Sequence, residues 1–523
     1  MKPQRFQGYY WLILLALLLY VPFILFGGFG TSDDLSLVAH IGPDYWQDLK
    51  YSLSRSGHIS RPIYGFVQTT LLHLFGSSYL LYNIFRLLLW AALIYIAHLV
   101  FNKSLGRNST LLFLFFLSFP IFASSQLFNA MQMGYILSII FFLLALRTTQ
   151  NQKGKETLRF YLVYVSWSLL ALLSCEIVFP LFLFPLLQLR STSKNSRVFR
   201  NVLLITGLVF LAVLILKFVI GPYYQIGDTA YGFSFSSHSI LQGLYYFFAL
   251  FVEFPLLLLE VVPFYFSEPL LWLSILVIPL VYYSNVESNK QWDKRTFLHA
   301  LITIFACCLI FILSNYPAVT YGLYNKMLLP SHLFVALVLA LLCIRLLNSK
   351  LYVLSYFIAV LWFASMEMQV INSIRSWDKR VEVYDRIVPI LDEENALDYI
   401  FVEVPYFLNS NYNNEPVFSL IEDFQGGLIL KDYSGDSEQV FPFTSKMLSD
   451  SLYWSNHNIL NVIRINQIDR FSCLYSTIKS TYSSDSIVYY NSGAASLPTS
   501  NYFSNQTECK RSEVRSWLST YFK

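Results

Sequence analysis

Long apolar blocks separated by short polar loops fill about the first 370 residues of the chain. The first block runs from Tyr9 to Gly27, behind the basic start Met1 to Arg5. Further blocks lie at 79–101, 110–124, 127–147, 159–175, 177–190, 201–221, 297–314, 327–347 and 351–370. Most of them approach the length of about 20 apolar residues with which a helix crosses a bilayer. We therefore predict an α-helical polytopic membrane domain over residues 1–370.

The region 240–284 is harder to assign, because proline and glutamate interrupt its apolar run (Glu253, Pro255, Glu260, Pro263 and Glu268). Lys and Arg gather in the loops 102–108, 148–158, 190–200, 290–295 and 345–350. Basic loops favour the cytoplasmic side, and this pattern is satisfied if 240–284 crosses once. We predict about 11 transmembrane helices, with a cytoplasmic N-terminus; 12 or 13 crossings remain the alternative.

The chain changes character after Val370. Residues 371–395 are predicted to form an amphipathic helix, and Tyr399 to Val404 and Ser486 to Tyr490 are predicted strands. About 150 residues are enough for an independent core. We predict a soluble mixed α/β domain over 371–523, outside the cytoplasm, in which Cys473 and Cys509 either form one disulfide or stay as two thiols.

Composition narrows the function. Charged residues make up only 13% of the chain, about half the share usual in soluble domains. The net charge of +4 comes from basic residues in short loops, so it indicates topology, and we expect no nucleic-acid partner. The sequence has no phosphate-binding Gly-rich loop before a helix and no His or Cys spacing typical of a permanent metal site.

The first loop, residues 28–78, carries the most informative chemistry. Asp33 and Asp34 follow the first predicted helix directly. A carboxylate at the membrane surface can act as general base for a hydroxyl, and two adjacent carboxylates can recruit Mg²⁺ or Mn²⁺. The simpler alternative is that these residues only mark a solvated helix end. Arg86, about two turns into the second predicted crossing, is a costly charge at that depth and is therefore a functional candidate.

Three short strings accompany the acidic pair. The first, Ser-Gly-His-Ile-Ser-Arg-Pro-Ile-Tyr at 56–64, contains His58 and Arg61 and precedes a short apolar helix predicted at 62–75 that ends in Phe-Gly. The second, Leu-Ser-Cys-Glu, ends at Glu176, and the third, Asn-Lys-Met-Leu-Leu-Pro, contains Lys326. This layout resembles the GT-C class of multi-spanning glycosyltransferases, which use polyprenyl-phosphate sugars, and in particular the bacterial branch that modifies O-antigen and other surface glycans.

Two positions depart from the pattern of that branch. Isoleucine follows Arg61-Pro62 where leucine is commoner, and lysine stands at 326 where arginine is usual. A lysine keeps the positive charge but loses the bidentate geometry of a guanidinium.

The resemblance implies an enzyme of the bacterial inner membrane that moves a sugar from a polyprenyl-phosphate donor to a glycan acceptor at the outer face, with inversion. Its partners would be that donor, the acceptor and membrane lipid. Asp33 or Asp34 would be the base; no cofactor is required, although the acidic pair could recruit Mg²⁺ or Mn²⁺ transiently. Donor phosphate would be bound by basic side chains (Arg61, Lys326 and Arg86), and the acceptor would be oriented by Glu176 and His58.

Other functions fit a chain of this kind. A glycan polymerase or ligase also has many crossings and outer arginines, although an acidic pair directly after the first helix is unusual for it. A transporter of lipid-linked glycans would favour internal repeats with charges at the midplane, and no repeat is visible here. A non-catalytic scaffold for surface assembly stays open.

Overall fold

The computed structural model describes residues 7–30, 33–39, 41–54, 61–128, 132–151, 157–192, 196–220, 236–285, 294–313, 318–320, 323–393, 399–403, 421–434, 440–443 and 487–491. The chain forms two compact units. The membrane unit comprises Met1–Gly28 and Gly42–Ser373, and the second unit comprises Phe29–Ile41 and Ile374–Lys523. The first loop, expected as one segment over 28–78, is therefore divided between the two units.

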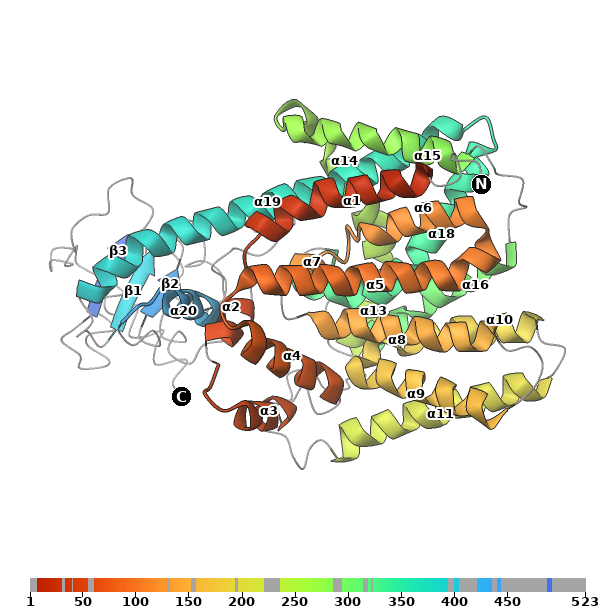
Figure 1. The fold of residues 1–523 in the computed structure, drawn as a ribbon, viewed down its shortest axis with the longest axis horizontal. Helices are drawn as coiled ribbons and strands as arrows, with labels where there is room; N and C mark the ends of the chain where they lie inside the picture. The colour runs from red at the N-terminus through yellow and green to blue at the C-terminus, as the bar shows by residue number, and fades with distance from the viewer. Residues whose placement is uncertain are drawn as a thin grey trace. The chain divides into compact units, whose positions relative to one another are not determined.

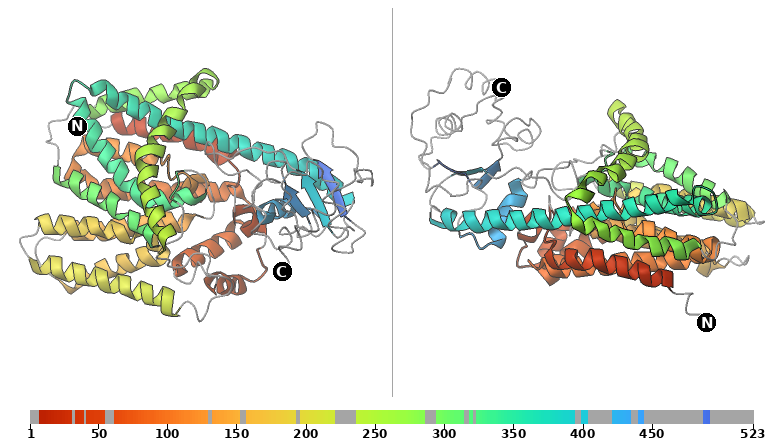
Figure 2. Two further views of the ribbon diagram at one scale, coloured as in Figure 1. Left: turned by 180° about the vertical axis from the view of Figure 1, so that it is seen from behind. Right: turned by 90° about the horizontal axis from the view of Figure 1, so that it is seen from above.

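The membrane unit consists of helices that run largely side by side (Figures 1 and 2). Its α-helices are α1 (Gln7–Phe26), α3 (Tyr45–Ser54), α4 (Pro62–Phe75), α5 (Tyr79–Leu105), α6 (Arg107–Ser118), α7 (Ser125–Phe128), α8 (Met133–Gln150), α9 (Leu158–Ser174), α10 (Leu183–Thr192), α11 (Ser196–Ile215), α13 (Ser237–Phe248), α14 (Phe254–Glu260), α15 (Val277–Asn285), α16 (Lys294–Ala306), α17 (Cys308–Ile312), α18 (Leu329–Leu347) and the first part of α19 (Tyr352–Glu393). Short 3₁₀ segments are η2 (Glu176–Phe182), η5 (Val262–Phe266), η6 (Pro269–Leu276) and η7 (Leu323–Leu328), and η3 (Leu216–Ile220) and η4 (Ala249–Glu253) are π-helical.

The predicted helical, polytopic architecture is confirmed. Among the described residues, eight helices are long and apolar enough to cross a membrane, and Leu158–Ser174 and Pro269–Ser284 are shorter apolar helices. Large apolar side chains such as Leu17, Leu88 and Leu208 stay exposed on these helices, as expected where the surrounding solvent is lipid. The ambiguous region contains one long candidate span, Ser237–Phe266, followed by the shorter Pro269–Ser284. The total of about 11 crossings stays a prediction.

The apolar block expected at 110–124 is helical only as far as Ser118. The following residues, 119–124, are buried but not helical, and Pro120 offers no backbone N–H to extend α6. Side chains of other helices satisfy the carbonyl groups exposed by this break: Trp90 Nε1 donates to Ser118 O at 3.1 Å, and Gln369 Nε2 donates to Ile121 O at 2.9 Å. Irregular backbone is tolerated inside a membrane bundle when protein groups bond it in this way.

The last predicted crossing at 351–370 and the amphipathic helix predicted at 371–395 are parts of one uninterrupted helix. Helix α19 continues from Tyr352 to Glu393 and passes from one unit into the other after Ser373. The segment around residue 370 contains neither glycine nor proline, so nothing in its sequence ends the helix.

The second unit contains described pieces of both helix and sheet. Helix α2 (Asp33–Ala39) packs against α20 (Ile421–Leu430). A parallel sheet has the order β2–β1–β3, formed by Val440–Phe443, Tyr399–Glu403 and Ile487–Asn491. Ile400 of β1 pairs with Val440 on one side and Val488 on the other. Two of these strands coincide with predicted ones, and the mixed α/β character of the whole domain stays a prediction. Cys473 and Cys509 lie outside the described residues.

Candidate functional site

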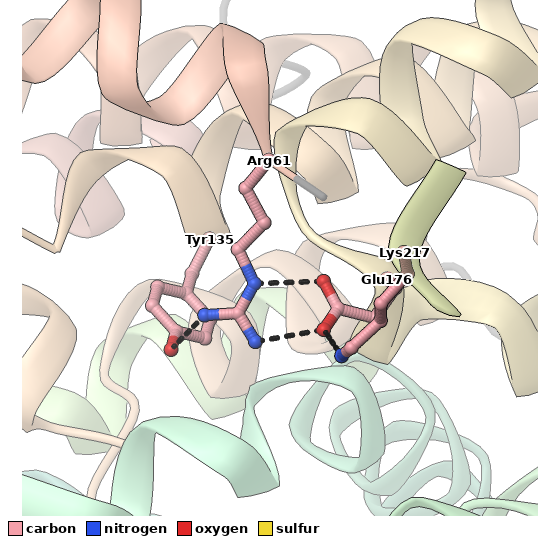
Figure 3. A network of polar contacts seen from close by, with 4 residues as sticks. All are labelled: Arg61, Tyr135, Glu176 and Lys217. Atoms are coloured by element: carbon pink, nitrogen blue, oxygen red, sulfur yellow. Dashed lines mark hydrogen bonds and ion pairs between the residues drawn. The ribbon is translucent and has the colours of Figure 1, made fainter. Parts of the chain in front are cut away.

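Arg61 and Glu176 form a bidentate ion pair in the membrane unit (Figure 3). Arg61 directly precedes Pro62, which occupies the first turn of α4 without needing a backbone donor. Glu176 begins η2, just after α9 ends. Arg61 Nε lies 2.7 Å from Oε2 of Glu176, and its Nη2 lies 3.0 Å from Oε1. Both side chains are largely buried, so this pair is held in a fixed geometry.

A second cation reaches the same carboxylate. Lys217 Nζ lies 2.5 Å from Oε1 of Glu176. Lys217 belongs to the π-helical turn η3, directly after the candidate span Arg197–Ile215. Lys217 is not among the residues predicted from the sequence. Lys217 is the one charged residue near the end of the apolar block 201–221, and a charge inside an apolar membrane segment is energetically costly. The same reasoning made Arg86 a candidate, so Lys217 could have been found in this way.

Tyr135 links these groups to a third cation. Arg61 Nη1 donates to the Tyr135 hydroxyl at 3.4 Å, and the Arg61 guanidinium carbon lies 5.8 Å from the centre of the Tyr135 ring. Lys326 Nζ lies 5.8 Å from the centre of the same ring, within cation–π distance. Two cations proposed from separate strings of the sequence therefore contact one aromatic side chain.

A glycine sets the packing of this tyrosine. Gly134 precedes Tyr135 in α8, and a Cβ at Gly134 would come 1.9 Å from Tyr64 Cδ2 in α4. The two tyrosine rings meet edge to face with centres 6.3 Å apart. The absence of a side chain at Gly134 thus lets α4, and with it Arg61, approach α8 closely.

Asn325 anchors the segment that carries Lys326. It is fully buried, and its Oδ1 accepts the backbone N–H of Ser125 at 3.1 Å. Its Nδ2 donates to Ser124 Oγ and to Thr320 O, each at 3.3 Å. One side chain thus joins η7 to the broken segment after α6.

We call Arg61, Lys217 and Lys326, together with Glu176, the cation cluster. Arg61 and Lys217 are paired with the carboxylate of Glu176, and Lys326 contacts the Tyr135 ring, so three cations and one carboxylate give the cluster a formal excess of two positive charges. Burial by itself would raise the pKa of Glu176, but the Arg61 guanidinium and the Lys217 ammonium outweigh it and lower that pKa below its usual range. Such a cluster suits a phosphate group, for which arginine and lysine are the usual protein ligands.

Arg86 belongs to another polar group. It is buried in α5, where its Nη2 donates to Asn83 Oδ1 and its guanidinium carbon lies 5.4 Å from the Phe23 ring centre. Asn83 Nδ2 in turn donates to Gly28 O at 3.5 Å. Arg86 therefore lies beside the end of α1, and its contact with donor phosphate stays a prediction.

Asp34 lies in the second unit and is 1% exposed, which does not fit a solvated helix end. Its Oδ2 accepts the backbone N–H of Gly30 at 3.0 Å. The carbonyl of Gly30 accepts Arg380 Nη1 at 2.7 Å, so a buried arginine that sequence reasoning missed lies near the acidic pair. Asp33 begins α2, but its side chain lies outside the described residues, and so does His58.

The described residues contain no group of three or more His, Cys, Asp or Glu that could hold a metal ion. A transient Mg²⁺ or Mn²⁺ at Asp33 and Asp34 stays a prediction.

The solved structures that are similar to this chain include two crystal structures of ArnT from Cupriavidus metallidurans. The one bound to undecaprenyl phosphate is 11% identical, with a TM-score of 0.39, over 84% of this chain and 91% of that one. The apo structure is 10% identical, with the same TM-score, over 84% and 90%. No protein-family model and no curated protein matches the chain. A likeness this weak does not decide the function, which has to follow from the residues themselves.

Proposed function

We propose that this chain is a glycosyltransferase of the GT-C class that moves a sugar from a polyprenyl-phosphate donor to a surface glycan such as O-antigen. The observation that carries the proposal is the cation cluster, in which Arg61, Lys217 and Lys326 come from three distant segments of one unit. A phosphate-bearing lipid is the ligand that suits a cationic group at the ends of apolar helices.

The position of the cluster along its helices supports a site at the outer membrane surface. Helix α9 begins next to the basic loop 148–158 and ends just before Glu176. Helix α11 begins at the basic loop 190–200 and runs toward Lys217. Since basic loops favour the cytoplasm, the opposite ends of these helices face outward, in the inner membrane of a bacterium.

The chemistry is a single displacement. The acceptor oxygen forms a bond to the anomeric carbon while the bond from that carbon to the phosphate oxygen breaks. The bonding electrons leave with the phosphate, where Arg61, Lys217 and Lys326 stabilise the developing charge. The acceptor proton passes to a base, for which Asp34, with Asp33, remains our candidate. One displacement inverts the anomeric centre and needs no covalent sugar–enzyme intermediate.

The remaining candidates have supporting roles in this proposal. Glu176 fixes the orientation of Arg61 and Lys217 by accepting bonds from both. His58 stays a candidate for binding the acceptor, and Arg86 stays a candidate for contact with the donor.

Sugar transfer by the purified full-length protein in liposomes tests the proposal. We expect label to move from a polyprenyl-phosphate sugar to an added glycan, and Arg61→Met to lower the rate by about 10²- to 10³-fold, the usual cost of removing one group that stabilises a developing oxyanion. Arg107→Met is the matched control, because Arg107 also stacks on a tyrosine, with its guanidinium carbon 5.7 Å from the Tyr9 ring centre.

Full activity in Arg61→Met would overturn the proposal. Movement of the lipid carrier across the bilayer without any transfer of sugar would instead favour a transporter.

A further inference from the structure

Glu176 is an unexpected residue for the centre of an anion site. Both of its carboxylate oxygens are bonded, Oε2 to Arg61 Nε at 2.7 Å and Oε1 to Arg61 Nη2 at 3.0 Å and to Lys217 Nζ at 2.5 Å. A carboxylate in this position repels any anionic ligand that the same cations attract. Its presence therefore costs affinity for phosphate and calls for a reason beyond binding.

We propose that Glu176 determines specificity: by limiting the positive charge of the cation cluster, it selects lipids that carry one phosphate over lipids that carry a diphosphate. This inference rests on the proposed function, which it deepens by assigning the discrimination between two classes of lipid carrier to one side chain.

Glu176 stays charged in this environment. Its carboxylate has two cationic partners, and these lower its pKa below the usual range. It is thus an anion at any pH at which a cell grows, and it cancels one of the three cationic charges.

The charge that remains in the cation cluster matches that of a single phosphate. A phosphate monoester, which the polyprenyl-phosphate leaving group becomes, carries about −1.5 to −2 at neutral pH. The formal excess of two positive charges in the cluster matches that value. A diphosphate carries about one negative charge more, which the cluster has no cation to balance while Glu176 is ionised.

The geometry of the Arg61 guanidinium also leaves room for one phosphate on one side only. Glu176 occupies the edge of the Arg61 guanidinium formed by Nε and Nη2. The Nη1 group instead donates to the Tyr135 hydroxyl at 3.4 Å, a long hydrogen bond that a phosphate oxygen could replace with a shorter one. A single phosphate at Nη1 would lie on the side of Tyr135, the residue that Lys326 also contacts.

The size of the effect follows from the charge that is removed. Glu176→Gln removes one negative charge close to the bound phosphate. Because a diphosphate carries about one negative charge more than a monophosphate, the substitution relieves more repulsion for the diphosphate. At the effective dielectric constant of a partly buried site, one such interaction is worth at least a tenfold change in affinity. We therefore expect the ratio of the two affinities to move by about tenfold or more toward the diphosphate.

Equilibrium binding of undecaprenyl phosphate and of undecaprenyl diphosphate to the full-length protein in nanodiscs tests the inference. Wild type should prefer the monophosphate, and Glu176→Gln should shift the ratio toward the diphosphate. Lys217→Gln should shift the ratio in the opposite direction, since it removes a positive charge. Glu268→Gln, which removes a carboxylate between η5 and η6, is the matched control and should leave the ratio unchanged.

The outcomes separate the two proposals. If wild type binds both lipids and neither Glu176→Gln nor Lys217→Gln moves the ratio, the role of Glu176 is wrong and the proposed function survives. If wild type binds neither lipid, both proposals fail together. Should Glu176→Gln fail to fold, the Lys217→Gln arm alone decides, because a ratio that stays constant or moves toward the diphosphate contradicts the charge argument.

Discussion

Arg61→Lys is the substitution that probes the geometry of the cluster while keeping its charge. The guanidinium donates through Nε and Nη2 to the two oxygens of Glu176, at 2.7 and 3.0 Å, and through Nη1 toward Tyr135. A lysine ammonium is a point charge on a flexible stem and cannot reproduce this planar fork. The variant therefore retains the attraction for phosphate and loses the alignment.

The magnitude follows from the bonds that are lost. A hydrogen bond to a charged group contributes about 1.5–3 kcal/mol, and the lysine forms at most one of the two parallel bonds to Glu176. If the lost alignment is felt fully in the transition state, a loss of about 2 kcal/mol corresponds to a roughly 30-fold lower kcat/KM. The loss should be smaller than that of Arg61→Met, which removes the charge as well.

Initial rates of sugar transfer in liposomes, with protein amount matched by in-gel quantification, measure this effect. Arg107→Lys is the control, because it makes the same exchange at the arginine stacked on Tyr9. A rate for Arg61→Lys equal to wild type would refute the argument from fork geometry. A rate as low as that of Arg61→Met would show that charge alone accounts for nothing at this position.

Three further expectations follow from the structure. The amide in Asp34→Asn can still accept a hydrogen bond from the Gly30 N–H, but it cannot take up a proton as a carboxylate does. We therefore expect sugar transfer to fall by about 10²- to 10⁴-fold at unchanged protein abundance. A normal surface glycan in this variant would rule out the role of Asp34 as base. Gly134→Ala places a methyl group 1.9 Å from the Tyr64 ring, so we expect thermal unfolding to show a free energy of unfolding lower by about 1–3 kcal/mol. An unchanged unfolding midpoint would contradict the close packing of α4 on α8. The folded-state pKa of Glu176 is lowered, so its stabilising contribution is present above its unfolded pKa of about 4.3 and is lost only as pH falls through the lower folded pKa. The difference in unfolding free energy between wild type and Glu176→Gln should therefore stay constant from about pH 8 to about pH 5. A difference that becomes smaller within that window would refute the ion-pair assignment.

The sequence was sufficient for the helical membrane architecture, because lipid requires long apolar runs and these are visible in the order of residues. It also identified Arg61, Glu176 and Lys326 as candidates, each from a short string. The structure joins Arg61 to Glu176 directly and places Lys326 on the tyrosine that Arg61 contacts.

Pairings over long distances in the chain could not be read from one sequence. Arg61 and Glu176 are 115 positions apart, and nothing in either string names its partner. Tyr135 and Asn325 were missed for the same reason, since an aromatic or an amide in an apolar setting has no distinctive local pattern. The early end of α6 did have a local signal in Pro120, but its apolar surroundings favoured a longer helix.

We propose above that the cation cluster binds the phosphate of a lipid carrier. Phosphorus NMR of undecaprenyl phosphate titrated with the purified protein is a direct test, because the resonance reports the surroundings of the phosphate itself. We expect a saturable shift with wild type that is abolished when Lys217 and Lys326 are both replaced by methionine. The same shift and the same affinity in that double variant would show that the cluster does not bind the phosphate.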